Sequence, residues 1–312
     1  MERSSENKII LIVRKTRLDE LITRFNTESQ ARFYVEHLGA DFSDYKREHE
    51  NYKTSILAAQ RLLSSIGRLQ TVDREFITNF IFGQTDTIVV LGQDGLVANC
   101  LKYLNGQSVV GVNPDPARWE GVLLPFTVPD LSRIIPEVFS RNRPISEVTM
   151  AKAELNNGQT LYGVNDLFIG PKSHTSAHYE LHIDGHTETH SSSGIIVSTG
   201  LGSTGWFRSV VAGATGIAAR LSGNKKQGKT QGNFAWDADY LYFSVREPWP
   251  SKTSSAETTF GKITSKKPLR LISHMPENGV IFSDGIENDF VEFNSGTLAL
   301  ISVADKIGHL VI

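Results

Sequence analysis

The chain has 312 residues, a formal net charge of −2 at pH 7, and hydrophobic (39%) and charged (21%) contents typical of a globular protein long enough for two domains. The near-neutral charge gives no electrostatic reason to expect duplex nucleic acid or an anionic membrane as a partner. The single cysteine, Cys100, excludes an intrachain disulfide and a multi-thiolate metal site. No apolar run is suited to the core of a signal peptide or to a bilayer span, so we expect a cytoplasmic protein.

The first part of the chain alternates predicted strands and helices. Apolar periodicity predicts strands at 8–13, 87–91 and 108–112, and helices at 16–25, 27–38, 52–66 and 96–104. This alternation predicts an open, parallel, Rossmann-like α/β sheet. Such sheets bind ligands at the carboxyl ends of their strands, where Gln93, Asp94 and Asn113 fall.

After about residue 126 the pattern becomes β-rich. A short helix is expected at 131–139, followed by hairpins that turn at 157–158 and 184–185. Further strands are expected at 241–245, 269–273, 280–283, 290–293 and 297–303. We predict an α/β domain at 1–126, a β-sandwich-like domain at 127–290, and a segment at 291–312 that could pack back on the first domain.

Two glycine-rich turns follow predicted strands and carry polar side chains. The turn at 92–95 (Gly-Gln-Asp-Gly) holds the carboxylate of Asp94, and the loop at 199–205, after the apolar run 195–197, consists mainly of Ser, Thr and Gly. Glycine lets the backbone approach a ligand closely, and hydroxyls donate and accept hydrogen bonds, which suits phosphate and ribose oxygens. The pattern predicts nucleotide binding, with these phosphate-binding residues: Gly92, Gln93, Gly202 and Ser203.

Histidines recur at every fourth position in one segment: His174, His178, His182, His186 and His190. On a helix this spacing is typical of metal ligands. The alternation at 179–183 and the Asp-Gly turn at 184–185 predict a hairpin instead, which pairs His182 with Thr187. The histidines of one strand then face away from those of the other, so we expect no metal site.

Three ordered motifs resemble those of NAD kinases: Gly92 to Gly95, Asn165-Asp166 and Ser193 to Trp206. The resemblance extends from the first predicted strand to about Ser283-Asp-Gly285. Two further stretches, 113–121 and 191–194, are more similar to the mitochondrial type of that family than to the common bacterial type. Ordered motifs over most of a chain are more specific than one short glycine motif.

The resemblance implies transfer of the γ-phosphoryl group of ATP, with Mg²⁺, to the 2′-hydroxyl of the adenosine ribose of NAD, giving NADP, in a homodimer or higher homo-oligomer. Asp94 matches the aspartate taken as the general base, and a carboxylate can accept the proton of a ribose hydroxyl. The residues matched to NAD binding are Asp94, Gly95, Asn165, Asp166, Thr204, Gly205, Trp206 and Ser209. The rest of phosphoryl transfer is positioning and charge neutralisation.

Other interpretations remain open. Gln93 stands where the family has glycine, and its side chain could block phosphate or require a different backbone angle, so the alternative is a catalytically silent NAD(P)-binding protein of the same fold. A lipid or sugar kinase is a third possibility. Asp94 could instead cap the following helix, and 165–166 and 199–205 could be structural turns. The lysines at 223–232 (Lys225, Lys226 and Lys229) could reach a phosphate or belong to a solvated loop.

Overall fold

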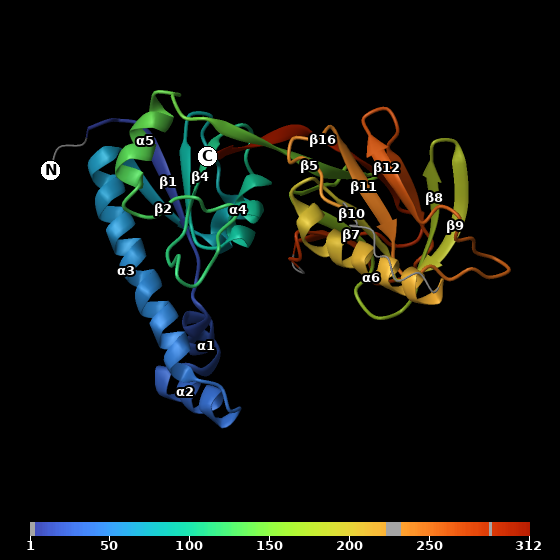
Figure 1. Ribbon diagram of the computed structural model, residues 1–312, viewed down its shortest axis with the longest axis horizontal. Helices are drawn as coiled ribbons and strands as arrows, with labels where there is room; N and C mark the ends of the chain where they lie inside the picture. Colours follow the sequence, from blue (N-terminus) through green and yellow to red (C-terminus); the bar gives the residue numbers. More distant parts are fainter. Residues whose placement is uncertain (1–3, 223–231, 287–288) are drawn as a thin grey trace. The chain divides into compact units, whose positions relative to one another are not determined.

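The computed structural model describes residues 4–222, 232–286 and 289–312, which form two compact units (Figure 1). Unit 1 comprises Met1–Ser146 and His309–Ile312, and unit 2 comprises Glu147–Gly308. The chain therefore leaves unit 1 after Ser146 and re-enters it at His309. Lys225, Lys226 and Lys229 lie outside the described residues.

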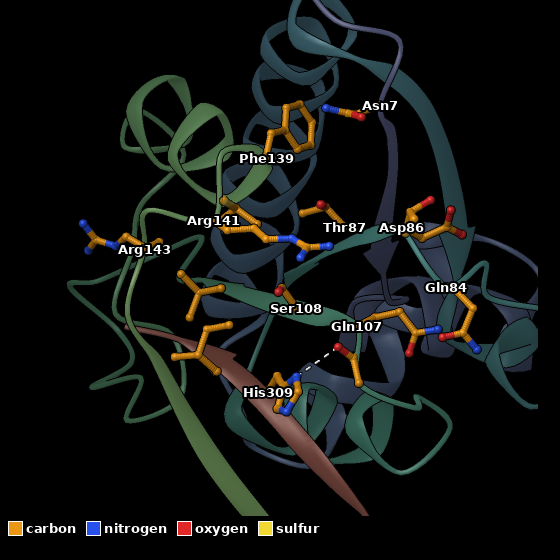
Figure 2. Close-up of a pocket in the computed structure, with 15 residues that line it drawn as sticks. Asn7, Gln84, Asp86, Thr87, Gln107, Ser108, Phe139, Arg141, Arg143 and His309 are labelled. Carbon is orange, nitrogen blue, oxygen red and sulfur yellow. Dashed lines mark hydrogen bonds between the residues drawn. The ribbon is translucent and has the colours of Figure 1, made fainter.

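Unit 1 is built on a parallel sheet, as the sequence predicts. Its strands are β1 (Lys8–Val13), β2 (Arg68–Asp73), β3 (Thr87–Leu91) and β4 (Ser108–Val112), in the order β2-β1-β3-β4, and the end of β16 (Leu298–Val311) pairs with β4. Strand β3 is buried along its whole length, which is typical of a parallel strand covered on both faces. Since the strands run the same way, their carboxyl ends share one edge. Their amino ends line a cavity at the other edge (Figure 2).

Helices cover both faces of this sheet (Figure 1). The helices of unit 1 are α1 (Arg17–Phe25), α2 (Glu28–His37), α3 (Phe42–Ile66), α4 (Asp94–Leu101) and α5 (Leu131–Phe139). The buried residues of α5 join the core formed by α3 and the sheet. This packing explains why unit 1 extends to Ser146 and not to residue 126 as predicted, and only the last four residues of the predicted 291–312 segment belong to it.

Helix α3 begins ten residues earlier than the predicted start at Tyr52. Its first turns are polar and give no apolar periodicity, but Asp41 caps them by accepting the N–H of Ser43. The helices α1 and α2 pack beside these turns around a small core of Leu18, Ala31, Val35 and Phe42. Thr16 starts α1 with a reciprocal capping box to Asp19.

Unit 2 is β-rich and has a core between two antiparallel layers. One layer contains β7 (Asp166–Pro171), β10 (Ile195–Ser198), β11 (Tyr240–Val245), β12 (Phe260–Thr264), β14 (Gly279–Ser283) and β15 (Phe290–Glu292). The other contains β5 (Ile145–Leu155), β6 (Thr160–Gly163), β8 (Ala177–Ile183), β9 (His186–Ser192), β13 (Leu269–Ser273) and β16. Alternate residues of both layers face the shared core.

The structure corrects several predicted elements of the chain. After the predicted turn at 157–158 the chain forms two strands and not one: β6 and β7 are separated by Val164 and Asn165. The helix expected at 96–104 runs over Asp94–Leu101, and an additional helix, α6 (Trp206–Leu221), follows the Ser/Gly loop. The β8–β9 hairpin has the predicted register, with His182 opposite Thr187. No helix of the described ranges is both long and apolar enough to cross a membrane.

Candidate functional site

The turn after β3 places Asp94 at the first position of α4. Gln93 precedes it as the N-cap residue, with φ −124° and ψ 161°, an extended backbone that any residue adopts. Gln93 therefore occupies this turn without a backbone angle that only glycine adopts easily. The side chain of Asp94 is also not the cap of this helix, since its carboxylate bonds elsewhere in unit 1.

The carboxylate of Asp94 accepts two backbone N–H groups from the loop that follows β4. The donors are Leu123, at 2.8 Å, and Val122, at 3.2 Å. A carboxylate has about four lone-pair positions, so two remain for other donors. Among the residues that the structure describes, Asp94 thus has a fixed orientation and unused acceptor capacity.

The loop from Asn113 to Phe126 is held close to the sheet. Asn113 is buried, and its amide donates to the carbonyl of Trp119 at 2.8 Å. Gly121 has φ +65°, which favours glycine. A Cβ on Gly111 would lie 1.9 Å from the carbonyl oxygen of Leu123, so only glycine permits this approach. The loop that binds Asp94 is therefore packed directly on β4.

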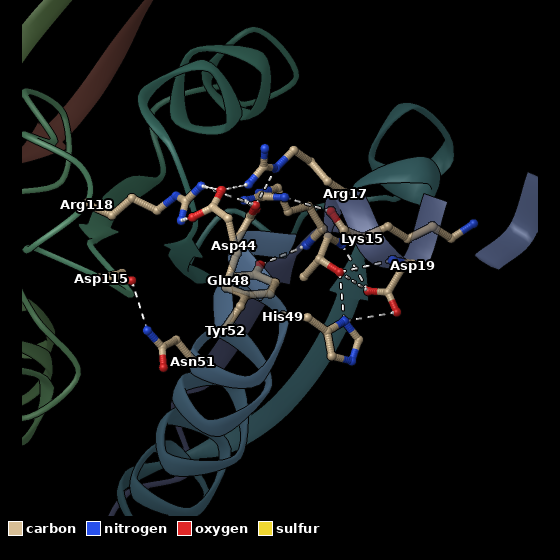
Figure 3. Close-up of polar contacts among 12 residues, drawn as sticks. Lys15, Arg17, Asp19, Asp44, Glu48, His49, Asn51, Tyr52, Asp115 and Arg118 are labelled. Carbon is tan, nitrogen blue, oxygen red and sulfur yellow. Dashed lines mark hydrogen bonds and ion pairs between the residues drawn. The ribbon is translucent and has the colours of Figure 1, made fainter. Parts of the chain in front are cut away.

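Ion pairs fasten the same loop to α3 (Figure 3). The guanidinium of Arg118 binds both oxygens of Asp44, at 2.8 and 2.7 Å, and Arg17 binds Asp44 at 2.9 Å. These hydrogen bonds hold the pKa of the Asp44 carboxyl well below its usual range, with Arg118 the largest cause. Glu48, which is buried, pairs with Arg14 at 3.0 Å beside them. The network joins α1, α3 and the loop that orients Asp94.

Arg118→Gln is expected to loosen the loop at Val122 and Leu123. The bidentate pair is partly exposed but belongs to a network, so we expect a loss of about 1 kcal/mol, or about fivefold faster amide hydrogen exchange at these two residues. Arg133→Gln is the matched control, because Arg133 pairs with Glu137 on the surface of α5 and lies outside this network. Unchanged exchange in Arg118→Gln would contradict the anchoring role.

In unit 2 the Ser/Gly loop lies against the backbone between β6 and β7. Strands β7 and β10 pair with Ser198 opposite Asp166. The N–H of Thr199 donates to the carbonyl of Asn165 at 3.0 Å. A Cβ on Gly202 would lie 1.9 Å from the same carbonyl oxygen, which requires glycine there. The structure thus brings the predicted pair 165–166 and the predicted loop together.

Asp284 organises this region and was not a predicted site residue. Its carboxylate accepts the N–H groups of Val164 at 2.9 Å, Asn165 at 2.6 Å and Asp166 at 3.3 Å. Its backbone is left-handed, with φ 56°. The sequence signal was an Asp-Gly dipeptide after a strand, the same signal as at Asp94. The dipeptide marks a turn, but it does not reveal which distant N–H groups the carboxylate binds.

Asp166 is buried beside Asp284, and its pKa is raised. Burial is the main cause and the negative charge of Asp284 the second, and together they raise the pKa of Asp166 to about 7. A carboxyl group protonated near neutral pH can donate as well as accept a hydrogen bond. This property distinguishes Asp166 from an ordinary surface carboxylate.

Asp166→Asn is expected to remove a pH-dependent loss of stability. Between about pH 4 and about pH 7 the unfolded chain releases this proton while the folded chain keeps it, so wild-type stability falls by up to about 1.4 kcal/mol per pH unit from this group. Urea unfolding at several pH values should therefore show that the unfolding free energy of the variant rises relative to that of the wild type over this range. Asp305→Asn is the control, because the hydroxyl of Tyr162 lowers the pKa of Asp305. The difference in unfolding free energy between this variant and the wild type should therefore stay constant over the same pH range. If the difference in unfolding free energy between Asp166→Asn and the wild type stays constant over this range, the pKa of Asp166 is not raised.

The remaining predicted residues surround the start of α6. Ser203 is fully buried, and its hydroxyl donates to the carbonyl of Gly200 at 2.7 Å, so this side chain is used inside the loop. The ring of Trp206 stacks on Phe168 at 5.7 Å between centroids. Trp206 and Ser209 line a cavity of about 930 Å³ between α6 and β11–β12. The cavity walls are largely apolar and aromatic, as in many small-molecule sites.

The predicted residues therefore fall into two groups. Unit 1 holds Gly92, Gln93, Asp94 and Gly95, and unit 2 holds Asn165, Asp166, Gly202, Ser203, Thr204, Gly205, Trp206 and Ser209. The residues of unit 1 form one turn, and in unit 2 the stretches 165–166 and 202–209 lie against each other at Asn165 and Gly202. Throughout the described ranges, no three His, Cys, Asp or Glu side chains are grouped so as to hold a metal ion.

Comparisons with known proteins identify the fold. No family model and no curated protein sequence matches this chain. Among solved structures, an NAD kinase from Archaeoglobus fulgidus in complex with ATP is similar with a TM-score of 0.55 and 13% identity, over 97% of this chain and 92% of that one. A yeast NADH kinase complexed with NADH has a TM-score of 0.58 and 15% identity, over 99% of this chain and 84% of that one. The chain has the two-domain fold of these kinases.

Proposed function

We propose that this protein is an NAD kinase, which transfers the γ-phosphoryl group of ATP to the 2′-hydroxyl of the adenosine ribose of NAD or NADH. The main support is Asp94, a carboxylate with free acceptor positions at the carboxyl end of β3, in a fold shared with kinases solved with ATP and with NADH. This edge of a parallel sheet is where such folds bind ligands.

In the proposed reaction Asp94 acts as the general base. One carboxylate oxygen accepts the proton of the 2′-hydroxyl while the ribose oxygen bonds to the γ-phosphorus and the bond to the β,γ-bridging oxygen breaks, releasing ADP. The hydrogen bonds from Val122 and Leu123 hold the carboxylate in one orientation. The N–H of Gly92 donates to the carbonyl of Val112 at 3.2 Å, so the backbone N–H groups that suit the phosphate oxygens are those of Gln93 to Gly95, at the start of α4.

Magnesium would arrive on the triphosphate of ATP. Mg²⁺ usually keeps several waters and binds through one or two carboxylates and substrate phosphates, which fits a chain whose described residues form no dedicated metal cage. When bound, it neutralises charge on the phosphates.

The unit 2 group is proposed to hold the dinucleotide. Asn165 and Asp166 offer an amide and a carboxyl group, enough to bond an adenine edge and ribose hydroxyls. The indole of Trp206, held by Phe168, offers a flat surface for a ring. Assembly as a homo-oligomer and a cytoplasmic location remain predictions.

The test is conversion of NAD or NADH to NADP(H) by the purified full chain with Mg-ATP, followed with an NADP-specific dehydrogenase, with GTP and polyphosphate as other donors. Turnover with any donor supports the proposal. No turnover, together with dinucleotide binding in calorimetry, supports the silent alternative, and Gln93→Gly should then restore activity. Absence of both turnover and binding rejects both functions.

A further inference from the structure

A second cavity lies at the edge of the unit 1 sheet opposite to Asp94. It has a volume of about 410 Å³ and is bounded by the amino ends of β1, β3 and β4 (Figure 2). Its polar lining includes Asn7, Gln84, Thr87, Ser108 and Arg141. Strand β3 connects the two edges, since Thr87 begins it and the Asp94 turn follows its end. The cavity is therefore distinct from the proposed active site.

The polar side chains of this cavity have unused hydrogen-bonding capacity. Within the part of the chain that the structure describes, the side chains of Asn7, Gln84, Thr87, Ser108 and Arg141 make no hydrogen bond or ion pair. Thr87 is only 5% exposed and Ser108 is partly buried, whereas Asn7, Gln84 and Arg141 are exposed at the mouth of the cavity. Because these side chains are not used inside the protein, they are available to a polar ligand.

Arg141 occupies a position that favours glycine. It follows the end of α5 with φ 56°, and its N–H donates to Val138 while the N–H of Asn142 donates to Glu137, at 3.0 and 2.9 Å. This is the Schellman ending of a helix, in which a residue with a Cβ is strained. Figure 2 shows the guanidinium directed toward the middle of the cavity lining. An arginine at a strained position suggests that its side chain has a function.

The other charged groups nearby already have partners. Asp86 accepts the N–H of Gly83 at 2.9 Å and pairs with Lys8 at 3.5 Å. Arg143 pairs with Glu137 at 3.2 Å. His309 donates its Nδ1–H to the carbonyl of Gly106, at 2.9 Å, which leaves Nε2 available. The charge of Arg141 is therefore not compensated by these neighbours, and the cavity favours an anion.

We infer that this cavity binds a phosphate monoester. The planar guanidinium of Arg141 and the hydroxyls of Thr87 and Ser108 match the oxygens of a phosphate group. The volume is in the range of small-molecule sites and exceeds the need of phosphate alone. The amides of Asn7 and Gln84 can bond hydroxyl groups on the organic part, so the ligand class is a phosphorylated sugar or nucleoside.

The site also touches both places where the chain passes between units. Ile145 and His309 line the cavity, and the crossings lie at Ser146–Glu147 and Gly308–His309. Occupancy should therefore slow amide hydrogen exchange in these two crossing segments. This readout does not depend on catalytic activity.

The test is calorimetry on the full chain with ribose 5-phosphate, ribose and inorganic phosphate as probes. Ribose 5-phosphate should bind, ribose should not, and Arg141→Gly should weaken binding by at least about tenfold, because the charge-assisted bonds are lost. Arg141→Gly should not lower the melting temperature, since glycine suits the left-handed backbone. Arg133→Gln, a surface arginine of the same helix, should bind the probe like the wild type.

Equal affinity in the wild type and Arg141→Gly would overturn the inference, as would no binding of ribose 5-phosphate at millimolar concentration. Displacement of the probe by NAD would also overturn it, because the probe would then occupy the dinucleotide site. Asp94→Asn should leave probe binding unchanged. Failure of the kinase assay would reject the proposed function without affecting this site.

Discussion

Asp94→Asn is expected to lower kcat for NADP formation by about 10²–10⁴-fold while unit 1 stays folded. Asparagine keeps one oxygen that can accept the N–H of Leu123 but cannot take the proton of a ribose hydroxyl. Its amide would also face the N–H of Val122, donor to donor, which should cost about 1 kcal/mol of stability. Steady-state kinetics with NAD and ATP, and circular dichroism for the fold, measure the two effects separately.

Asp130→Asn is the matched control for this variant. Asp130 lies at the start of α5, another helix of unit 1, and its carboxylate accepts the N–H of Thr127 at 2.7 Å. It should lose a similar amount of stability and keep its kcat. If Asp94→Asn retains kcat within a few-fold, Asp94 is not the general base.

Gly202→Ala is expected to disrupt the Ser/Gly loop of unit 2. The new Cβ would lie 1.9 Å from the carbonyl oxygen of Asn165, so the loop and the backbone before β7 must separate. We expect a loss of about 3 kcal/mol or more in unfolding free energy, since a backbone carbonyl cannot move aside as the end of a flexible side chain can. Dinucleotide affinity should fall at least about tenfold, because the Asn165 and Asp166 side chains move with that backbone.

Gly216→Ala provides the opposite control. Gly216 lies within α6, and a Cβ there meets no atom within 4 Å. Alanine should stabilise the helix by about 0.5–1 kcal/mol and leave dinucleotide binding unchanged. Urea unfolding and calorimetry of both variants compare the same substitution in two settings. Equal effects of the two substitutions would show that the close approach at Gly202 is not important.

Elements defined by local patterns were predicted well. The strands at Lys8–Val13, Thr87–Leu91 and Ser108–Val112 have the predicted bounds, because short runs of β-branched residues between turn residues indicate buried strands. The β8–β9 register was correct because an Asp-Gly turn sets the pairing of a hairpin. Elements without a local signal were not predicted well, such as the polar first turns of α3 and the Gly- and Ala-rich helix α6.

The sequence alone determined the alternation of strands and helices, the glycine turns and the identity of Asp94 as a carboxylate at a strand end, because these depend on residues close together in the chain. Only the tertiary structure decided that Asp94 receives the N–H groups of Val122 and Leu123, and that Asp284 binds the backbone of Val164 to Asp166. These partners are distant in the sequence. A carboxylate accepts any suitably placed N–H group, so composition and periodicity carry no information about which one it binds.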